Sequence, residues 1–219
     1  MADQIRILRL AYQTDALIGV GPGRCGTLSL AKILSSSPRV HCVHEAYRMT
    51  EGMTPDVGEM MRRLEPIRDG NLHGQVGMLW LGLVPIIRLQ YPNLPVVCLH
   101  RDKDAVIRSY MKRQENRKRP WLLNIFGPVD RVTPTYLAEH WDWCETQMEF
   151  IGDPVFHMQT EELGSDSKLN ELYEFLGVPD SARRFPYERR FHVATDVAER
   201  EDQTQIDYFD ALPSAAAGG

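Results

Sequence analysis

Residues 16–34 of the chain read ALIGVGPGRCGTLSLAKIL, and this stretch decides the fold. Its first residues are apolar or small and run into a glycine-rich turn, which predicts a short buried strand over 17–20. Leu and Ile recur at helical spacing after the turn, so we expect a helix over 27–34 that packs against a sheet. A strand, a glycine turn and a helix in this order can cradle a phosphate group, because the first amides of the helix point at an anion.

The rest of the chain alternates between short apolar runs and helical patterns. Further strands are predicted over 40–43, 95–100 and 155–159, and helices over 53–67, 79–89, 104–114, 136–150 and 168–176. Pro85 is expected to kink the helix over 79–89, and 116–134 is expected to be a loop. Strands that alternate with helices imply a three-layer α/β fold around a central parallel sheet. We expect one domain over 1–213 and an Ala/Gly tail over 214–219.

The composition bounds the class of protein. The 219 residues suffice for one α/β domain with its own core. The net charge of -5 argues against nucleic acid or an anionic membrane as a partner. No run approaches the roughly 20 apolar residues of a membrane span, and the first residues have no signal-peptide pattern. The four cysteines are scattered without a CxxC pair, which disfavours a metal site and fits a cytoplasmic chain.

Three kinds of nucleotide site are compatible with the glycine turn. Residues 21–26 match the G-x-G-x-x-G pattern of dinucleotide-binding proteins, and Glu45 follows where their ribose-binding acid belongs, but Pro22 removes an amide from the turn. The same turn has the spacing of a nucleotide triphosphatase loop, although the Lys-Ser/Thr that ends such loops is missing. The third interpretation places the cation inside the turn, where the Arg24 guanidinium closes over an anion held by the amides.

The third interpretation resembles the loop of the sulfotransferases that use 3′-phosphoadenosine 5′-phosphosulfate (PAPS). Their loop reads roughly Arg/Lys-Ser-Gly-Thr/Ser, and this chain has RCGT at 24–27. A second motif follows the strand predicted over 95–100: Arg101 and Ser109 have the eight-residue spacing of the family's arginine and serine that bind the donor's 3′-phosphate. A third stretch, 155–179, is similar to the family's late strand, acidic-Leu turn and Phe-Leu-Gly helix end.

The resemblance implies a donor site and a reaction. The residues that would surround the 5′-phosphosulfate are Gly23, Arg24, Cys25, Gly26, Thr27 and Leu28, the last through its backbone amide. Arg101 and Ser109 would bind the 3′-phosphate, and Arg113, one helical turn beyond Ser109, would add charge to it. The implied reaction transfers the sulfuryl group of PAPS to a hydroxyl or amine acceptor, without a metal. Arg24 would stabilise the leaving group.

The general base is expected in the stretch RVHCVHEAYR at 39–48, near the end of the second predicted strand. We favour Glu45, because tyrosylprotein-type members of the family carry Glu at the matching place. His44 is the alternative, because an imidazole titrates near neutral pH. The lysine found upstream in some members is matched here by Gln75, which brings no charge, so Arg24 would act alone or with His73.

Two further interpretations stay open at this point. A chain without the family's second cation could bind PAPS or its product, 3′-phosphoadenosine 5′-phosphate (PAP), without transferring sulfate. A Rossmann-type oxidoreductase is the other alternative. The basic segment 183–190 either closes over the nucleotide or lies on the surface.

Overall fold

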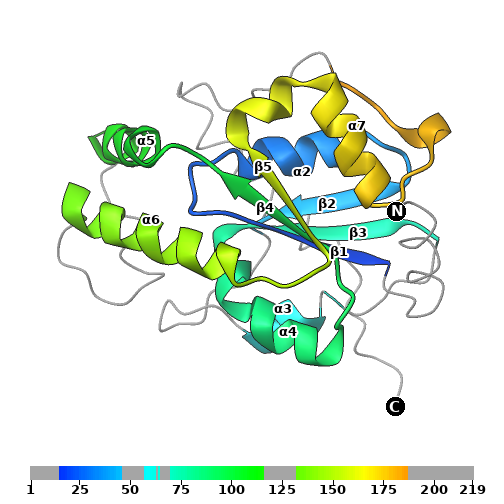
Figure 1. The fold of residues 1–219 in the computed structure, drawn as a ribbon, viewed down its shortest axis with the longest axis horizontal. Helices are drawn as coiled ribbons and strands as arrows, with labels where there is room; N and C mark the ends of the chain where they lie inside the picture. The colour runs from blue at the N-terminus through cyan, green and yellow to red at the C-terminus, as the bar shows by residue number, and fades with distance from the viewer. Residues whose placement is uncertain (1–14, 46–56, 63, 65–69, 116–131, 187–219) are drawn as a thin grey trace.

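The structure, a computed structural model, describes residues 15–45, 57–62, 64, 70–115 and 132–186. A sheet of five parallel strands forms its centre, in the order β2-β3-β1-β4-β5 (Figure 1). The strands are β1 (Ala16–Val20), β2 (Val40–His44), β3 (Leu72–Val76), β4 (Val96–His100) and β5 (Val155–Gln159). This order differs from the 3-2-1-4-5-6 order of Rossmann dinucleotide-binding folds, because β3 lies between β1 and β2.

Helices cover both faces of the sheet, which confirms the expected three-layer α/β architecture. One face carries α2 (Thr27–Ser35) and α7 (Asp166–Phe175), and the other carries α3 (Val57–Arg62), α4 (Val84–Gln90) and α6 (Pro134–Glu149) (Figure 1). α5 (Lys103–Glu115) follows β4 and lies beyond its carboxyl end. Short 3-10 turns are η1 (Met78–Leu83), η3 (Thr160–Gly164) and η4 (Asp180–Ala182). Within the described part of the chain, no helix is long and apolar enough to cross a membrane.

The two faces of the sheet bury separate apolar clusters, because neighbouring residues of a strand point to opposite sides. Leu17 of β1 joins the cluster beneath α2 and α7, and Ile18 joins the cluster beneath α3, α4 and α6. β1 is buried along its whole length, as expected of a central strand covered on both faces. The turn after β1 therefore opens between the ends of β3 and β4, at the edge of the sheet where ligands of open α/β folds bind.

The sequence pattern did not predict β3. Its residues read LHGQV, and a run that holds His, Gly and Gln lacks the continuous apolar character of a buried strand. The strand is buried all the same, because β1 and β2 pair with it on its two sides. Gly74 permits this packing, since a Cβ there would collide with the sulfur of Cys42 in β2.

The helix predicted over 79–89 consists of two elements. η1 covers Met78–Leu83, and α4 begins at Val84, so Pro85 stands in the first turn of a helix and does not kink one. Proline is well tolerated there, because the first amides of a helix have no intrahelical acceptor.

Several expectations reach beyond the described residues. Of the helix predicted over 53–67, the structure describes α3 and Leu64. The loop expected over 116–134 lies outside the described residues up to 131, and α6 already begins at Pro134. The tail over 214–219 and the end of the basic segment, 187–190, lie outside them as well.

Candidate functional site

The turn after β1 has the backbone of a tight, left-handed bend. Gly23 and Gly26 have φ values of 78° and 88°, and Arg24 between them has a φ of 52°. Among the described residues, Arg24 and Glu45 (φ 48°) are the two that adopt positive φ without being glycine. Such strained positions cluster at functional sites, because the surrounding structure must hold them in place. Both residues were singled out from the sequence for chemical roles.

A tyrosine of α5 packs against this turn and donates a hydrogen bond to it. The Tyr110 hydroxyl donates to the Pro22 carbonyl at 3.3 Å and occupies the space that a side chain at Gly23 would need. Tyr110 is 7% exposed, and burial together with the nearby Glu45 charge raises the pKa of its hydroxyl. The phenol therefore stays protonated and acts as a donor. The sequence placed Tyr110 only in the core, because its apolar helix face gives no sign of the distant turn.

Cys25, between Arg24 and Gly26 of the turn, points inward. Its side chain is fully buried, and burial raises the pKa of the thiol to about 12. A thiol of this kind is neutral at physiological pH, so Cys25 does not act as a nucleophile. Its neighbour Leu28 is partly exposed at the start of α2, while Ser29 is 8% exposed and therefore buried.

The two sequence motifs meet at this turn. Arg24 Nε donates to Ser109 Oγ at 3.1 Å, and the Arg101 guanidinium donates to the Arg24 carbonyl. These contacts join residues 85 and 77 positions apart. The Nε of Arg101 is buried without a hydrogen-bond partner among the described residues, and no described carboxylate pairs with this guanidinium. An arginine without an acidic partner suits an external anion such as a phosphate.

A threonine that the sequence did not single out connects the same two segments. Thr160, at the start of η3, lies 2.6 Å from the Cys25 carbonyl and 3.0 Å from the His100 carbonyl through its hydroxyl oxygen. The hydroxyl has one proton, so the two carbonyls compete for it and the shorter contact dominates. Asp102 caps α5 by accepting the amide of Ala105 at 2.8 Å. The turn and the β4–α5 junction are therefore held together by side chains from three elements.

The two candidates for the general base lie at the end of β2. His44 Nε2 is 3.0 Å from the hydroxyl of Thr27, the first residue of α2. Glu45 follows it, and its amide donates to the Val76 carbonyl of β3 at 2.8 Å. The Glu45 side chain packs over Gly77, where an added Cβ would lie 3.1 Å from its Cγ. Both side chains are partly exposed, so the choice between them stays a prediction.

Gln75 and His73 do not lie at the turn. Gln75 is 7% exposed, lies within β3 and pairs with Ile18 of β1; its Oε1 has no partner among the described residues. His73 pairs with Ala16 at the start of β1 and lies beside His41, with 5.4 Å between the ring centroids and 37° between the ring planes. With about 3.3 Å of rise per residue, His73 lies roughly 10 Å from the carboxyl end of β3. Its position does not support a role beside Arg24.

The remaining basic residues divide between local contacts and undescribed side chains. Arg183 pairs with Asp180 at 2.8 Å and donates to Asn170 at 2.7 Å, so it braces the end of α7. Arg184 donates to the carbonyl of Ser181, also locally. Arg113 belongs to α5, but its side chain lies outside the described residues.

A buried histidine lies behind the turn. His140 of α6 is 7% exposed, and its Nε2 is 3.2 Å from the sulfur of Met78. Burial lowers the pKa of this imidazole to about 4, so it is neutral at physiological pH. Beside it, Tyr136, Glu139 and Trp143 complete the wall of an open depression of about 340 Å³ on one face of α6.

Nothing in this arrangement points to a metal centre. In residues 15–45, 57–62, 64, 70–115 and 132–186, no three His, Cys, Asp or Glu side chains are grouped to hold an ion. The donors that converge on the turn are guanidinium, hydroxyl and amide groups, and all of these bind anions.

Comparison with solved structures supports the same fold. The structure is similar to the crystal structure of a sulfotransferase from Alicyclobacillus acidocaldarius, with a TM-score of 0.56 and 19% sequence identity. The match covers 87% of this chain and 91% of the other. At this identity the likeness concerns the fold. A scan against protein-family models gives no match, and neither does a search of curated proteins.

Proposed function

We propose that the protein is a sulfotransferase that transfers the sulfuryl group of PAPS to a hydroxyl or amine acceptor. The observation that carries the proposal is the meeting of Arg24, Arg101 and Ser109 at the turn after β1. Each was expected from the sequence to contact the donor, and no local pattern requires segments so far apart to touch. The sulfotransferase fold of the structural neighbour supports the same conclusion.

The donor would lie across the turn and the β4–α5 junction. The backbone amides at residues 23–28 and the positive end of α2 suit the 5′-phosphosulfate. Arg101 and Ser109 suit the 3′-phosphate, and Arg24, whose Nε donates to Ser109, would lie between the two phosphates. PAPS binding would replace the contact between Arg24 and Ser109 with contacts to phosphate oxygens.

The reaction needs one proton transfer and one displacement. Glu45, or His44 in its place, would accept the proton of the acceptor hydroxyl, and the freed oxygen would form a bond to the donor's sulfur. The bond between that sulfur and the bridging oxygen of the 5′-phosphate breaks, and PAP leaves. Arg24 would stabilise the charge that develops on the leaving phosphate oxygen.

A binding measurement tests the donor site before any acceptor is known. PAP should bind more tightly than AMP by about ten- to a hundredfold, the value of one charge-assisted contact to the 3′-phosphate. Isothermal titration calorimetry gives both affinities. Arg101→Ala should make the affinities for PAP and AMP nearly equal. Arg108→Ala, on the exposed face of α5, should leave the ratio of the two affinities unchanged. Equal binding of PAP and AMP by the unaltered protein would overturn the proposal.

A second function is favoured by one observation. Gln75 stands where some relatives have a lysine, and it is buried within β3, so the described residues supply no second cation from that strand. A protein of this kind would bind PAP or PAPS without transfer. Incubation with PAPS and a panel of phenols, alcohols and amines, with detection of released PAP, distinguishes the two. Release above the rate of spontaneous hydrolysis identifies the transferase.

A further inference from the structure

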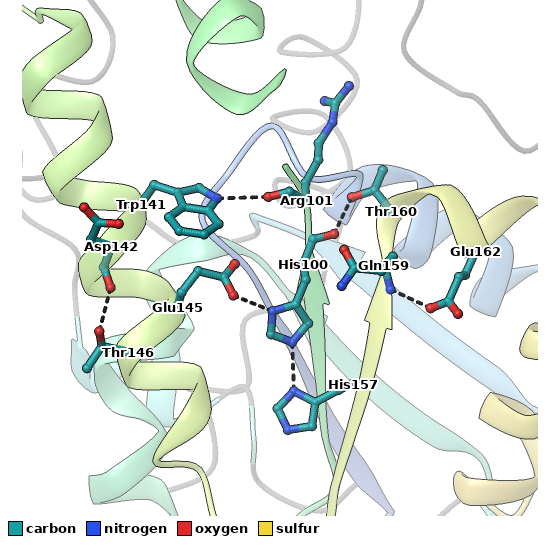
Figure 2. Close-up of polar contacts among 10 residues, drawn as sticks. All are labelled: His100, Arg101, Trp141, Asp142, Glu145, Thr146, His157, Gln159, Thr160 and Glu162. Carbon is teal, nitrogen blue, oxygen red and sulfur yellow. Dashed lines mark hydrogen bonds and ion pairs between the residues drawn. The ribbon is translucent and has the colours of Figure 1, made fainter. Parts of the chain in front are cut away.

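A chain of polar side chains runs beneath the end of β4, across three elements of the fold (Figure 2). Glu145 Oε2 of α6 lies 2.6 Å from His100 Nδ1, at the last residue of β4. His100 Nε2 lies 2.8 Å from His157 Nδ1 on β5. We call these three residues the Glu145 chain.

The hydrogen bonds of the Glu145 chain engage both ring nitrogens of His100. The Glu145 carboxylate can only accept, so His100 donates through Nδ1–H. Its Nε2 shares the second hydrogen bond with His157 Nδ1, and either ring nitrogen can be the donor. Partial desolvation and the nearby His100 lower the pKa of His157. Each bond has one donor and one acceptor, so the His100 ring is held in a single orientation.

The residue after His100 is Arg101. Helix α6, which carries Glu145, also contacts Arg101 directly. Trp141, one turn before Glu145 on α6, donates its indole N–H to the Arg101 carbonyl at 3.0 Å (Figure 2). Thr160 contacts the His100 carbonyl from the other side. The backbone on either side of the Arg101 side chain is therefore fixed by α6 and η3.

The cost of burying the Glu145 carboxylate argues for a role beyond packing. Its Oε1 is buried and has no hydrogen-bond partner among the described residues. The side chain as a whole is 17% exposed, so the carboxyl group is largely shielded from water. A buried oxygen without a partner is destabilising, and an apolar side chain of similar size would avoid that penalty. The charged group is therefore better explained by the orientation that it gives His100.

We infer that Glu145 is a positioning residue of the donor site, which acts through His100 to align Arg101 with the 3′-phosphate of the nucleotide. The inference rests on the proposed function. Since the 3′-phosphate is the part of the nucleotide that Arg101 would contact, a loss of its alignment should weaken PAP binding more than AMP binding. A residue with a purely structural role would lower the stability without changing the preference between these two nucleotides.

The test is a double-mutant cycle on that preference. Glu145→Ala should lower the ratio of the AMP to the PAP dissociation constant about three- to tenfold, the net value of one hydrogen bond. Glu145→Gln should restore most of the ratio, because the amide oxygen still accepts from His100 Nδ1–H. In an Arg101→Ala background, Glu145→Ala should have no further effect on the ratio. Glu149→Gln, an exposed change one turn further along α6, serves as the control.

The possible outcomes separate the inference from the proposed function. If the unaltered protein does not distinguish PAP from AMP, the proposed donor site fails and the inference with it. If it does distinguish them and Glu145→Ala keeps the full ratio, only the inference fails. An effect of Glu145→Ala that persists without Arg101 also overturns it. Glu145→Leu, which removes the same hydrogen bond but fills the space, gives the same readouts should Glu145→Ala not fold.

Discussion

The two sides of the candidate site differ in how far apart along the chain their contacting residues lie. On the donor side, hydrogen bonds join the turn after β1 to Arg101, Ser109 and Thr160, which lie 77 to 135 residues further along the chain. On the base side, at the ends of β2 and β3, His44 Nε2 lies 3.0 Å from the Thr27 hydroxyl, 17 positions earlier in the chain. The Glu45 amide donates to the Val76 carbonyl of β3 at 2.8 Å.

Under the proposed function, the donor side binds the nucleotide and the base side serves the chemical step. A site for a doubly phosphorylated nucleotide gains from fixed donors, because their alignment lowers the entropy lost on binding. Substitutions on the donor side should therefore affect nucleotide binding and stability. Substitutions on the base side should affect turnover and leave nucleotide binding intact.

The largest expected effect is on the base side. Glu45→Gln should lower turnover by about 10²–10⁴-fold, the usual contribution of a general base, and leave PAP affinity nearly unchanged. The reason is that a carboxylate contributes nothing favourable to an anionic ligand. PAP release in the presence of an acceptor, or slow hydrolysis of PAPS, provides the rate, and calorimetry provides the affinity.

His44→Asn is the matched variant for this experiment. It should be milder than Glu45→Gln if Glu45 is the base, and more severe if the roles are reversed. Should neither variant change turnover by more than a few-fold, the base lies outside this pair, and the contrast between the two sides of the site breaks down.

On the donor side, Arg24→Ala should weaken both binding and transfer. Under the proposed function the guanidinium would contact the donor before and during the reaction, so we expect a loss of about ten- to a hundredfold in PAP affinity and a further loss in turnover. Arg39→Ala removes the same charge at an exposed position before β2 and should change neither quantity. Unchanged PAP affinity in Arg24→Ala would remove Arg24 from the donor site.

The support of the turn by α5 can be tested through Gly23. Gly23→Ala should lower the free energy of unfolding by about 2 kcal/mol or more, because its φ of 78° disfavours a side chain and the new Cβ would meet the Tyr110 hydroxyl. Tyr110→Phe removes that hydroxyl, so Gly23→Ala should cost less in this background. Urea unfolding gives both values.

Gly82→Ala is the control for the Gly23 experiment. An added Cβ at Gly82 would have its nearest neighbour at 4.0 Å, in Trp143. We therefore expect a change within about 0.5 kcal/mol. Equal effects of Gly23→Ala with and without the Tyr110 hydroxyl would show that α5 does not support the turn.

The smallest expected effect concerns the histidine behind the turn. Burial lowers the pKa of His140 from 6.5 to about 4, so the folded state resists its protonation. The contribution of His140 to the free energy of unfolding is fully present above pH 6.5 and is lost as the pH falls toward 4. Between pH 7 and pH 5 the loss is about 2 kcal/mol. In His140→Gln, the decrease in the free energy of unfolding between pH 7 and pH 5 should be smaller by about 2 kcal/mol, as measured by urea unfolding at both pH values.

Thr146→Ala is the matched variant on α6, because Thr146 is exposed and does not titrate. It should retain the pH dependence of the unaltered protein. If His140→Gln also retains it, the acid sensitivity has another source, and the neutral state inferred for His140 is wrong.

The tyrosine and the threonine at the site show the limit of local patterns. Tyr110 fits an apolar helix face, and Thr160 follows a strand, so neither position differs in sequence from an ordinary core or turn residue. Their contacts with Pro22 and Cys25 span 88 and 135 residues. Only the order of the strands, which places β1 beside β4, brings these segments together.

The sequence by itself determined the features that depend on nearby residues. The glycine spacing at 21–26 and the apolar run of β4 are local, because turn conformation and buried strands leave a mark within a few residues. The spacing of Arg101 and Ser109, on which the resemblance rests, also lies within a short stretch of sequence. These features were enough to predict the parallel α/β fold and a phosphate site.

Only the tertiary structure decided which of these residues meet. β3 is a strand because β1 and β2 bury it, although its own residues are mixed. Arg24 reaches Ser109, and Glu145 reaches His100, through the packing of α5 and α6 at the end of β4. Such contacts depend on the free energy of the whole fold, since burial by distant segments has no signature in a short stretch of chain.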